Sequence, residues 1–322
     1  MTLPGLPSLL FGYHMPTQTF PETPPDRLFE RIAANAQAAE AAGFDLVTVM
    51  DHFYQIGGVG TEEEPMLEGY STLAALATRT SRIRLAVMVA GVTYRNPALT
   101  AKLITSLDII SRGRAVLGLG AAWNEDEHIG YGFAFPPIGE RMDRLEETLK
   151  ICQLMFTEDR PSFEGHYYRI ERALNQPKPL QRGGPPILIG GTGERRTLRI
   201  AAQYADITNW FGPMDLLQQR MGVLDRHCAE VGRDPSTILR TVSVPMLVVD
   251  DLRRADAIRA SLVPERRAQV RIVEPDEAVE QLQPYLDLGF RGIVFRNPGM
   301  ADPESIAVLG EVISRVRAAA SA

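Results

Sequence analysis

A glycine-rich segment combines the residue types and spacing that bind an anion. It reads Ile189-Gly190-Gly191-Thr192-Gly193-Glu194-Arg195-Arg196 and lies between an apolar run and a segment with helical periodicity. Glycine lets the backbone turn tightly and approach a ligand, and the N–H groups at the start of a helix attract negative charge. Arg195 or Arg196 would add a cation. The segment therefore predicts a phosphate site, with an ordinary tight turn as the alternative.

A carboxylate and an imidazole are adjacent at Asp51 and His52, directly after the apolar run 46–50. Histidine exchanges a proton near neutral pH, and a neighbouring carboxylate can orient it. The pair suits general acid–base catalysis, and capping of the following turn is the alternative. The histidines of the chain are His14, His52, His128, His166 and His227. Since they show no HxH or HExxH spacing, the sequence predicts no metal site.

Three further segments lie where strands are expected to end. Met88-Val89-Ala90-Gly91 is an apolar strand end with small residues, suited to packing either against a flat ring or within an ordinary core. The segment 120–124 follows another apolar run, and Arg296-Asn297 follows the last one. Active sites of (β/α)8 barrels form at the carboxyl ends of the strands, so these segments are candidates if the chain is a barrel.

The elements that must position these residues are short apolar runs alternating with helical periodicity, which is typical of parallel βαβ units. Strands are expected at 9–13, 46–50, 85–89, 115–119, 187–189, 206–209, 241–249 and 292–295, and helices at 26–42, 73–80, 97–112, 140–156, 194–204, 215–231 and 305–318. Eight such units predict a (β/α)8 TIM barrel. No GxGxxG follows the first strand, which argues against a dinucleotide-binding doubly wound sheet. We expect one domain over 1–322, with insertions near 158–186, where a small hairpin is expected, and 250–288.

The composition is that of an ordinary globular protein. Of 322 residues, 45% are hydrophobic and 23% are charged, and the net charge of −6 predicts no nucleic-acid surface. Cys152 and Cys228 belong to no CxxC pair, so we expect buried thiols. The N-terminus lacks a basic region before its apolar run, and no stretch reaches the roughly 18 apolar residues of a membrane span. The sequence therefore predicts a cytoplasmic protein.

Several blocks follow one another in a specific order and spacing. They are AEAAGFDLVTVMDHF (39–53), TLAALATRTSRIRLAVMVAGVTYRNPALTAK (72–102), SRGRAVLGLGAAWNEDEH (111–128) and PPILIGGTGERRTLRIAAQYAD (185–206). Together they resemble the luciferase-like monooxygenase superfamily, and in particular its branch of coenzyme F420-dependent oxidoreductases. The resemblance implies a barrel with insertions in which a flavin-type ring lies over the strand ends.

The resemblance also implies roles for individual residues. The family's non-prolyl cis peptide would lie at Met88-Val89, against the ring. The cofactor phosphate would be held by Gly190, Gly191, Thr192 and Gly193. Asn124 would contact the cofactor. Asp51 and His52 would line the substrate side of the ring, with His52 as proton donor or acceptor.

Two departures prevent the transfer of a substrate. The sugar-phosphate dehydrogenases of the family have a tryptophan shortly after the Asp-His pair, where this chain has Tyr54-Gln55-Ile56. They also have a catalytic glutamate where this chain has Gln18.

The resemblance favours F420 over FMN. It implies hydride transfer between the deazaflavin and a small organic substrate, which the apolar residues of the expected loops predict to be moderately hydrophobic. One alternative is an FMN-dependent two-component monooxygenase supplied by a separate reductase. Others are a non-catalytic flavin-binding protein and a metal-free lyase or isomerase with a substrate phosphate on the glycine-rich segment. By analogy with the family we expect a homodimer.

Overall fold

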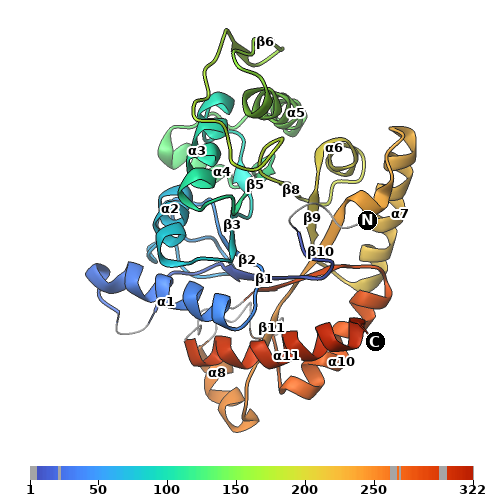
Figure 1. Cartoon of the computed structure of the whole chain (residues 1–322). Coiled ribbons are helices and arrows are strands. Elements are labelled where there is room, and N and C mark those ends of the chain that lie inside the picture. Colours follow the sequence, from blue (N-terminus) through green and yellow to red (C-terminus); the bar gives the residue numbers. More distant parts are fainter. Residues whose placement is uncertain (1–5, 21–22, 262–266, 268–269, 297–302, 322) are drawn as a thin grey trace. The chain divides into compact units, whose positions relative to one another are not determined.

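The computed structural model describes residues 6–20, 23–261, 267, 270–296 and 303–321 (Figure 1). Its internal contacts group the chain into two compact units. We call Leu85–Ile238 the central unit, and Thr2–Arg84 with Leu239–Ala322 the terminal unit. Each unit contains parallel strands alternating with helices, as the sequence predicts. The single domain expected from the sequence stays a prediction.

Four parallel strands form the sheet of the terminal unit. Their order is β2 (Leu46–Val49), β1 (Leu10–Met15), β13 (Gly292–Arg296) and β10 (Leu239–Val244). The helices of this unit include α1 (Leu28–Ala41), α2 (Gly69–Arg79), α10 (Pro275–Asp287) and α11 (Pro303–Ser321). Gly12 lies opposite Val294, and a Cβ atom on Gly12 would lie 3.0 Å from Val294 Cγ2. The side chain of Val294 therefore fills the space that the glycine leaves.

The expected strand 241–249 is two strands. β10 ends at Val244, and β11 (Met246–Val248) pairs in parallel with β12 (Arg271–Val273). Pro245 lies between β10 and β11 and has no N–H group with which to continue a ladder. Together with β11, the strand β12 and α8 (Ala255–Ser261) form a small packed region that includes part of the range 250–288, for which the sequence predicts an insertion. Its core residues are Leu247, Val249, Ile258, Val270 and Ile272.

The central unit also has four neighbouring parallel strands. Their order is β3 (Arg84–Val87, from Leu85 onward in this unit), β5 (Ala115–Gly120), β8 (Ile187–Gly190) and β9 (Ile207–Trp210), and β4 (Ala90–Gly91) pairs with the end of β5. The main helices are α3 (Pro97–Ile110), α5 (Ile138–Thr157), α6 (Thr197–Tyr204) and α7 (Met214–Glu230). The predicted start of α3 is confirmed, because Asn96 Oδ1 accepts a hydrogen bond from Ala98 N at 2.9 Å.

The excursion 158–186 contains the predicted hairpin, with β6 (Phe163–Glu164) antiparallel to β7 (Arg169–Ile170). Two carboxylates hold the excursion. Asp108 of α3 is fully buried and accepts the backbone N–H groups of Leu180 and Gln181 at 2.7 and 3.1 Å. Glu147 of α5 accepts the backbone N–H groups of residues 166, 167 and 168. The segment is therefore fastened to two helices of its own unit.

Cys152 and Cys228 are both buried, as predicted. Within the described part of the chain, no helix has the length and apolar character needed to cross a membrane.

Candidate functional site

In the terminal unit, polar side chains gather where the strands end. Asp51 and His52 follow β2, and Asp51 is only 3% exposed while His52 is half-buried. His14 of β1 is also buried, and its Nδ1 lies 2.8 Å from Thr48 Oγ1 of β2. Arg296 stands opposite His14 in the register, and burial lowers its pKa. The sequence analysis did not propose a role for His14, although its place two residues after Gly12 puts both on one face of β1.

Gln18 and Gln55, which belong to the two segments that depart from the family pattern, have structural partners. Gln18 is 2% exposed, and its Oε1 accepts a hydrogen bond from Leu67 N at 2.6 Å. Gln55 is equally buried, and its Nε2 donates to the carbonyl oxygen of Pro16 at 3.2 Å. Both side chains therefore hold loop backbone, and neither supplies a carboxylate.

In the central unit, the Met88-Val89 peptide is cis, as the resemblance implies. Both residues are half-buried, whereas the strand that precedes them is buried from Leu85 onward. A Cβ atom on Gly190 would lie 2.6 Å from Val89 Cγ2, and one on Gly120 would lie 2.8 Å from it. The side chain of Val89 thus occupies the space beside both glycines. Packing alone explains why residue 190 is glycine, so its role toward a cofactor stays a prediction.

The rest of the glycine-rich turn is open to solvent. Gly191 has a φ of +106°, a conformation that favours glycine, and both Gly191 and Gly193 are exposed while Thr192 is half-buried. α6 begins at Thr197, three residues after the expected start at 194, and no side chain caps it. The helix end therefore offers backbone N–H groups without a capping side chain.

The two arginines after this turn differ in their surroundings. Arg196 forms an ion pair with Asp143 of α5, with Nη2 and Oδ1 2.5 Å apart. Arg195 is exposed, and among the residues that the structure describes it has no hydrogen bond or ion pair. Glu194 is occupied, because its Oε1 accepts a hydrogen bond from Gln219 at 2.7 Å. An exposed turn with an unpaired guanidinium beside it fits a phosphate group.

Asn124 lies in a buried polar cluster that begins the short helix α4 (Glu125–Tyr131), which the sequence analysis did not predict. Asn124 Nδ2 donates to Glu127 Oε2 at 3.2 Å, and Tyr94 OH donates to the same oxygen at 2.9 Å. His128 Nδ1 lies 2.6 Å from the carbonyl oxygen of Asn124, and its Nε2 lies 2.7 Å from Thr93 Oγ1. Glu127 and His128 are fully buried, and the sequence analysis assigned neither a role.

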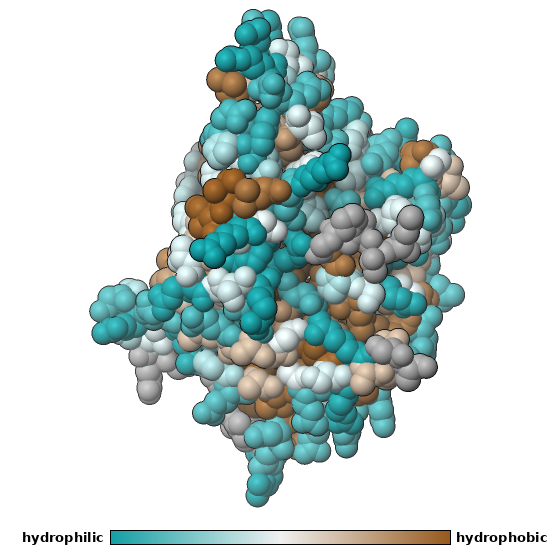
Figure 2. Space-filling view, in the orientation of Figure 1, coloured by the Kyte–Doolittle hydropathy of each residue, from teal (hydrophilic) through white to brown (hydrophobic). Residues whose placement is uncertain are grey.

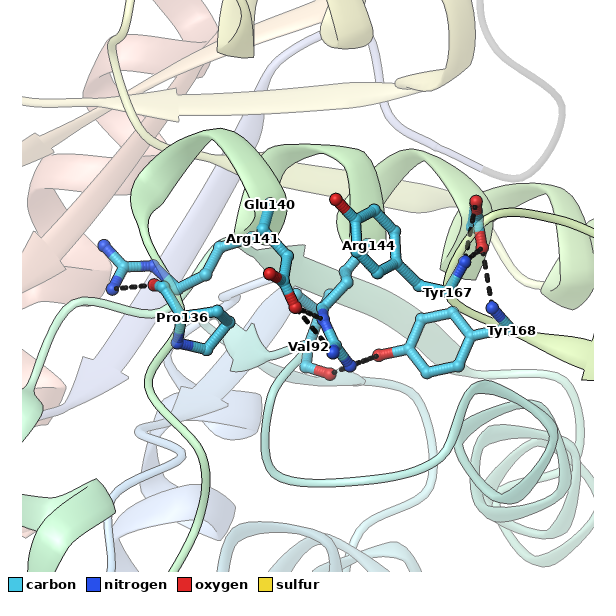
Figure 3. A network of polar contacts seen from close by, with 8 residues as sticks. Val92, Pro136, Glu140, Arg141, Arg144, Tyr167 and Tyr168 are labelled. Atoms are coloured by element: carbon cyan, nitrogen blue, oxygen red, sulfur yellow. Dashed lines mark hydrogen bonds and ion pairs between the residues drawn. The ribbon is translucent and has the colours of Figure 1, made fainter.

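Arg144 of α5 holds the hairpin against the residues that follow β4 (Figure 3). Its Nη2 lies 2.6 Å from Glu140 Oε1, and its Nη1 donates to Tyr168 OH at 3.4 Å. Tyr168 OH in turn donates to the carbonyl oxygen of Val92 at 3.5 Å. The guanidinium carbon also lies 5.0 Å from the centre of the Tyr167 ring. The hairpin, α5 and the segment after β4 are therefore joined through one guanidinium.

The segment between β5 and α5, together with the first residue of α5, exposes large apolar side chains. Their exposed fractions are 61% for Trp123, 71% for Ile129, 53% for Tyr131 and 57% for Ile138. Figure 2 shows an apolar group over the region that Figure 1 labels α4, within a face that is otherwise mostly hydrophilic. These exposed side chains agree with the apolar loop residues from which the sequence analysis predicts a moderately hydrophobic substrate.

Within the described ranges, no three or more His, Cys, Asp or Glu side chains are grouped so that they could hold a metal ion. Asn297, a candidate from its place after the last strand, lies outside the described residues.

The chain is similar to known proteins over nearly its whole length. Residues 10–316 match the family model described as luciferase-like monooxygenase. An F420-dependent glucose-6-phosphate dehydrogenase of Nakamurella multipartita is 30% identical over an alignment that covers 97% of this chain and 98% of that protein.

Two solved structures show the same fold. An F420-dependent secondary alcohol dehydrogenase in complex with an F420-acetone adduct has a TM-score of 0.80 at 20% identity, covering 96% of this chain and 99% of that one. EDTA monooxygenase from Chelativorans sp. has a TM-score of 0.82 at 17% identity, covering 97% and 94%. The predicted (β/α)8 barrel with insertions is confirmed by this likeness.

Proposed function

Because the chain belongs to the luciferase-like monooxygenase family, we propose that it is an oxidoreductase that uses coenzyme F420 to transfer a hydride to or from a small organic substrate. The choice of F420 is supported by a relative of nearly equal length that is named as F420-dependent. The observation that carries the proposal is the exposed glycine turn ahead of an uncapped helix, because it fits the phosphate of such a cofactor.

The cofactor, when bound, supplies two-electron hydride chemistry, and the chain supplies binding, orientation and proton transfer. The backbone N–H groups of Gly190, Gly191, Thr192 and Gly193 would hold the phosphate. Arg195 would balance its charge. Met88 and Val89 would contact the ring, and Asn124 would donate or accept a hydrogen bond.

His52 is the proposed proton donor or acceptor, and Asp51 the carboxylate that orients it. His14 is a second candidate for proton transfer, because it is a buried imidazole at the end of a neighbouring strand of the same unit. We do not extend the glucose-6-phosphate substrate of the relative to this chain, since Gln18 holds Leu67 and provides no carboxylate. Moderately hydrophobic carbonyl compounds, enones and imines are the proposed substrate class, because each accepts a hydride.

The alternative is an FMN-dependent monooxygenase that receives reduced flavin from a separate reductase. It is favoured by the likeness to EDTA monooxygenase. The homodimer and the cytoplasmic location predicted from the sequence belong to the same proposal, and sedimentation of the purified protein tests the first of them.

Fluorescence titration of the purified protein with F420 and, separately, with FMN tests the proposal. Gly193→Asp is the informative variant, because it adds a negative charge to the turn and its Cβ would lie 2.9 Å from Thr197 Oγ1. Gly139→Asp is the matched control, since nothing lies within 4 Å of a Cβ at that exposed position.

We expect F420 to bind the natural chain and Gly139→Asp alike, and Gly193→Asp at least about tenfold more weakly, since each 1.4 kcal/mol is tenfold in affinity. Selective binding of FMN would replace the proposal by the monooxygenase. Binding of neither cofactor would refute both. Turnover that survives His52→Ala and Asp51→Asn unchanged would refute the proton-transfer roles.

A further inference from the structure

Asn124 occupies the N-cap position of α4 but does not cap it. An asparagine there ordinarily accepts a hydrogen bond from a backbone N–H of the first turn, and this stabilises a helix by about 1 kcal/mol. In this chain the side chain makes no such bond, and Nδ2 donates instead to Glu127 Oε2. Asn124 therefore lacks the stabilising cap hydrogen bond, and Glu127 holds its amide in another orientation.

Glu127 determines which end of that amide faces outward. Its Oε2 accepts the hydrogen bond from Nδ2 of Asn124, so this oxygen faces Nδ2 and not Oδ1 of the amide. Tyr94 OH donates to the same carboxylate oxygen at 2.9 Å and fixes its position. Because Nδ2 and Oδ1 lie on opposite sides of the amide, Oδ1 of the half-buried Asn124 is directed away from Glu127.

His128 holds the main chain of the same residue. A carbonyl oxygen only accepts hydrogen bonds, so His128 Nδ1 donates to the Asn124 carbonyl at 2.6 Å. In the neutral imidazole, Nε2 is then an acceptor for the hydroxyl of Thr93 at 2.7 Å. The His128 ring packs against two aromatic rings, with the centres of the Tyr94 and Phe135 rings each 4.6 Å away.

These contacts connect two segments to which the proposed function assigns cofactor contacts. Thr93 and Tyr94 follow the Met88-Val89 segment, and Asn124 follows β5. The Tyr94 ring lies over Gly91, where an added Cβ would be 2.9 Å from two ring atoms. A shift of either segment would therefore break buried hydrogen bonds, which are costly to leave unmade.

We propose that Glu127 and His128 are positioning residues for the cofactor site: Glu127 sets the orientation of the Asn124 amide, and His128 sets the position of its backbone. The inference rests on the proposed function, since it assumes that Asn124 contacts the cofactor. Neither residue touches the cofactor itself, because both side chains are fully buried among protein atoms.

A double-mutant cycle on Glu127 and Asn124 tests this inference. Glu127→Gln keeps the shape but introduces an amide that can donate to Asn124 Oδ1, so the Asn124 amide is free to turn over. The variants are Glu127→Gln, Asn124→Ala and the two combined. The readouts are the F420 dissociation constant from fluorescence, with FMN titrated in parallel, and the thermal unfolding midpoint.

We expect each single variant to weaken cofactor binding about tenfold, and the double variant to weaken it about tenfold as well, because Glu127 acts through Asn124. Glu125→Gln, on the exposed side of the same helical turn, is the control and should bind as the natural chain does. His128→Gln acts on the backbone, so its effect should persist in the Asn124→Ala background. Tyr94→Phe, which removes only the hydroxyl, replaces Glu127→Gln if that variant does not fold.

Effects that multiply to about a hundredfold in the double variant would overturn the inference, as would unchanged binding by Glu127→Gln. A lower unfolding midpoint with unchanged binding would assign Glu127 a purely structural role. If the natural chain binds neither cofactor, the proposed function itself fails. If the natural chain and all variants bind F420 equally well, the proposed function stands and only this inference fails.

Discussion

Substitution of Gly190 by alanine tests whether the shape of Val89 requires a glycine at the end of β8. The added Cβ would lie 2.6 and 2.9 Å from Val89 Cγ2 and Cγ1, closer than real contacts allow. Val89 Cγ2 also lies 2.8 Å from the position that a Cβ on Gly120 would take, so the side chain of Val89 already fills the space beside both glycines. Overpacking of this kind costs about 1–3 kcal/mol, and each kcal/mol lowers the unfolding midpoint by about 2–4 °C in domains of 150–250 residues. We therefore expect Gly190→Ala to unfold roughly 2–12 °C below the natural chain.

The test is whether a second substitution restores the stability that Gly190→Ala loses. Val89→Ala removes two methyl groups, which lowers stability by up to about 1.6 kcal/mol at about 0.8 kcal/mol for each group. In the Gly190→Ala background it also removes the clash, so the double variant should be no less stable than Val89→Ala alone. Urea and thermal unfolding followed by circular dichroism measure all four proteins. Gly139→Ala is the control: a Cβ there meets nothing within 4 Å, and replacing a helical glycine should add about 0.5–1 kcal/mol. Losses that simply add in the double variant would refute the packing argument.

Two further predictions concern single buried groups. Burial raises the pKa of Asp206 despite the hydrogen bond from Ile187 N. The folded state therefore holds this proton more tightly than the unfolded state, and the resulting stability is present below the ordinary pKa of 3.8 and lost as pH rises through the raised pKa. Asp206→Asn should gain stability relative to the natural chain across that window in urea unfolding at a series of pH values, and a constant difference would contradict it. Burial raises the pKa of Cys152 to about 12, and Cys228 is also buried, so Ellman's reagent should react with neither thiol in the native protein and with both in guanidinium. Rapid reaction of the native protein would contradict that expectation.

The sequence predicts the end of a helix or strand best where that end depends on residues next to it in the chain. The Asn96-Pro97 pair marked the start of α3, and the hydrogen bond from Ala98 N confirms it. The start of α6 was wrong by three residues, because the chain turns through Gly191 before the helix begins. The expected strand 241–249 is divided at Pro245. The residues on both sides of Pro245 are apolar, so the sequence reads as one continuous strand.

The candidate site was predicted where it depends on short motifs. The Met88-Val89 cis peptide was implied by the family resemblance, and the glycine turn was predicted from the glycines themselves. Glu127 and His128 were missed because their partners Tyr94 and Thr93 are 33 and 35 residues away. Only the fold brings these side chains together, and in the sequence they read as the charged start of a surface helix.

The attachment of the excursion 158–186 has a consequence for how the chain tolerates change. Glu147 binds backbone N–H groups of the excursion, and Asp108 binds two backbone N–H groups together with the side-chain amide of Gln181, so most of these contacts follow the path of the main chain. Between these two attachment points Asn175 is fully buried and donates to Thr105 Oγ1 and to the carbonyl oxygen of Met155, so substitutions should be tolerated only at the exposed positions of this stretch. The exposed positions of the excursion can therefore change the surface of the central unit without disturbing its strands, provided that Asn175, Asp108 and Glu147 keep their contacts.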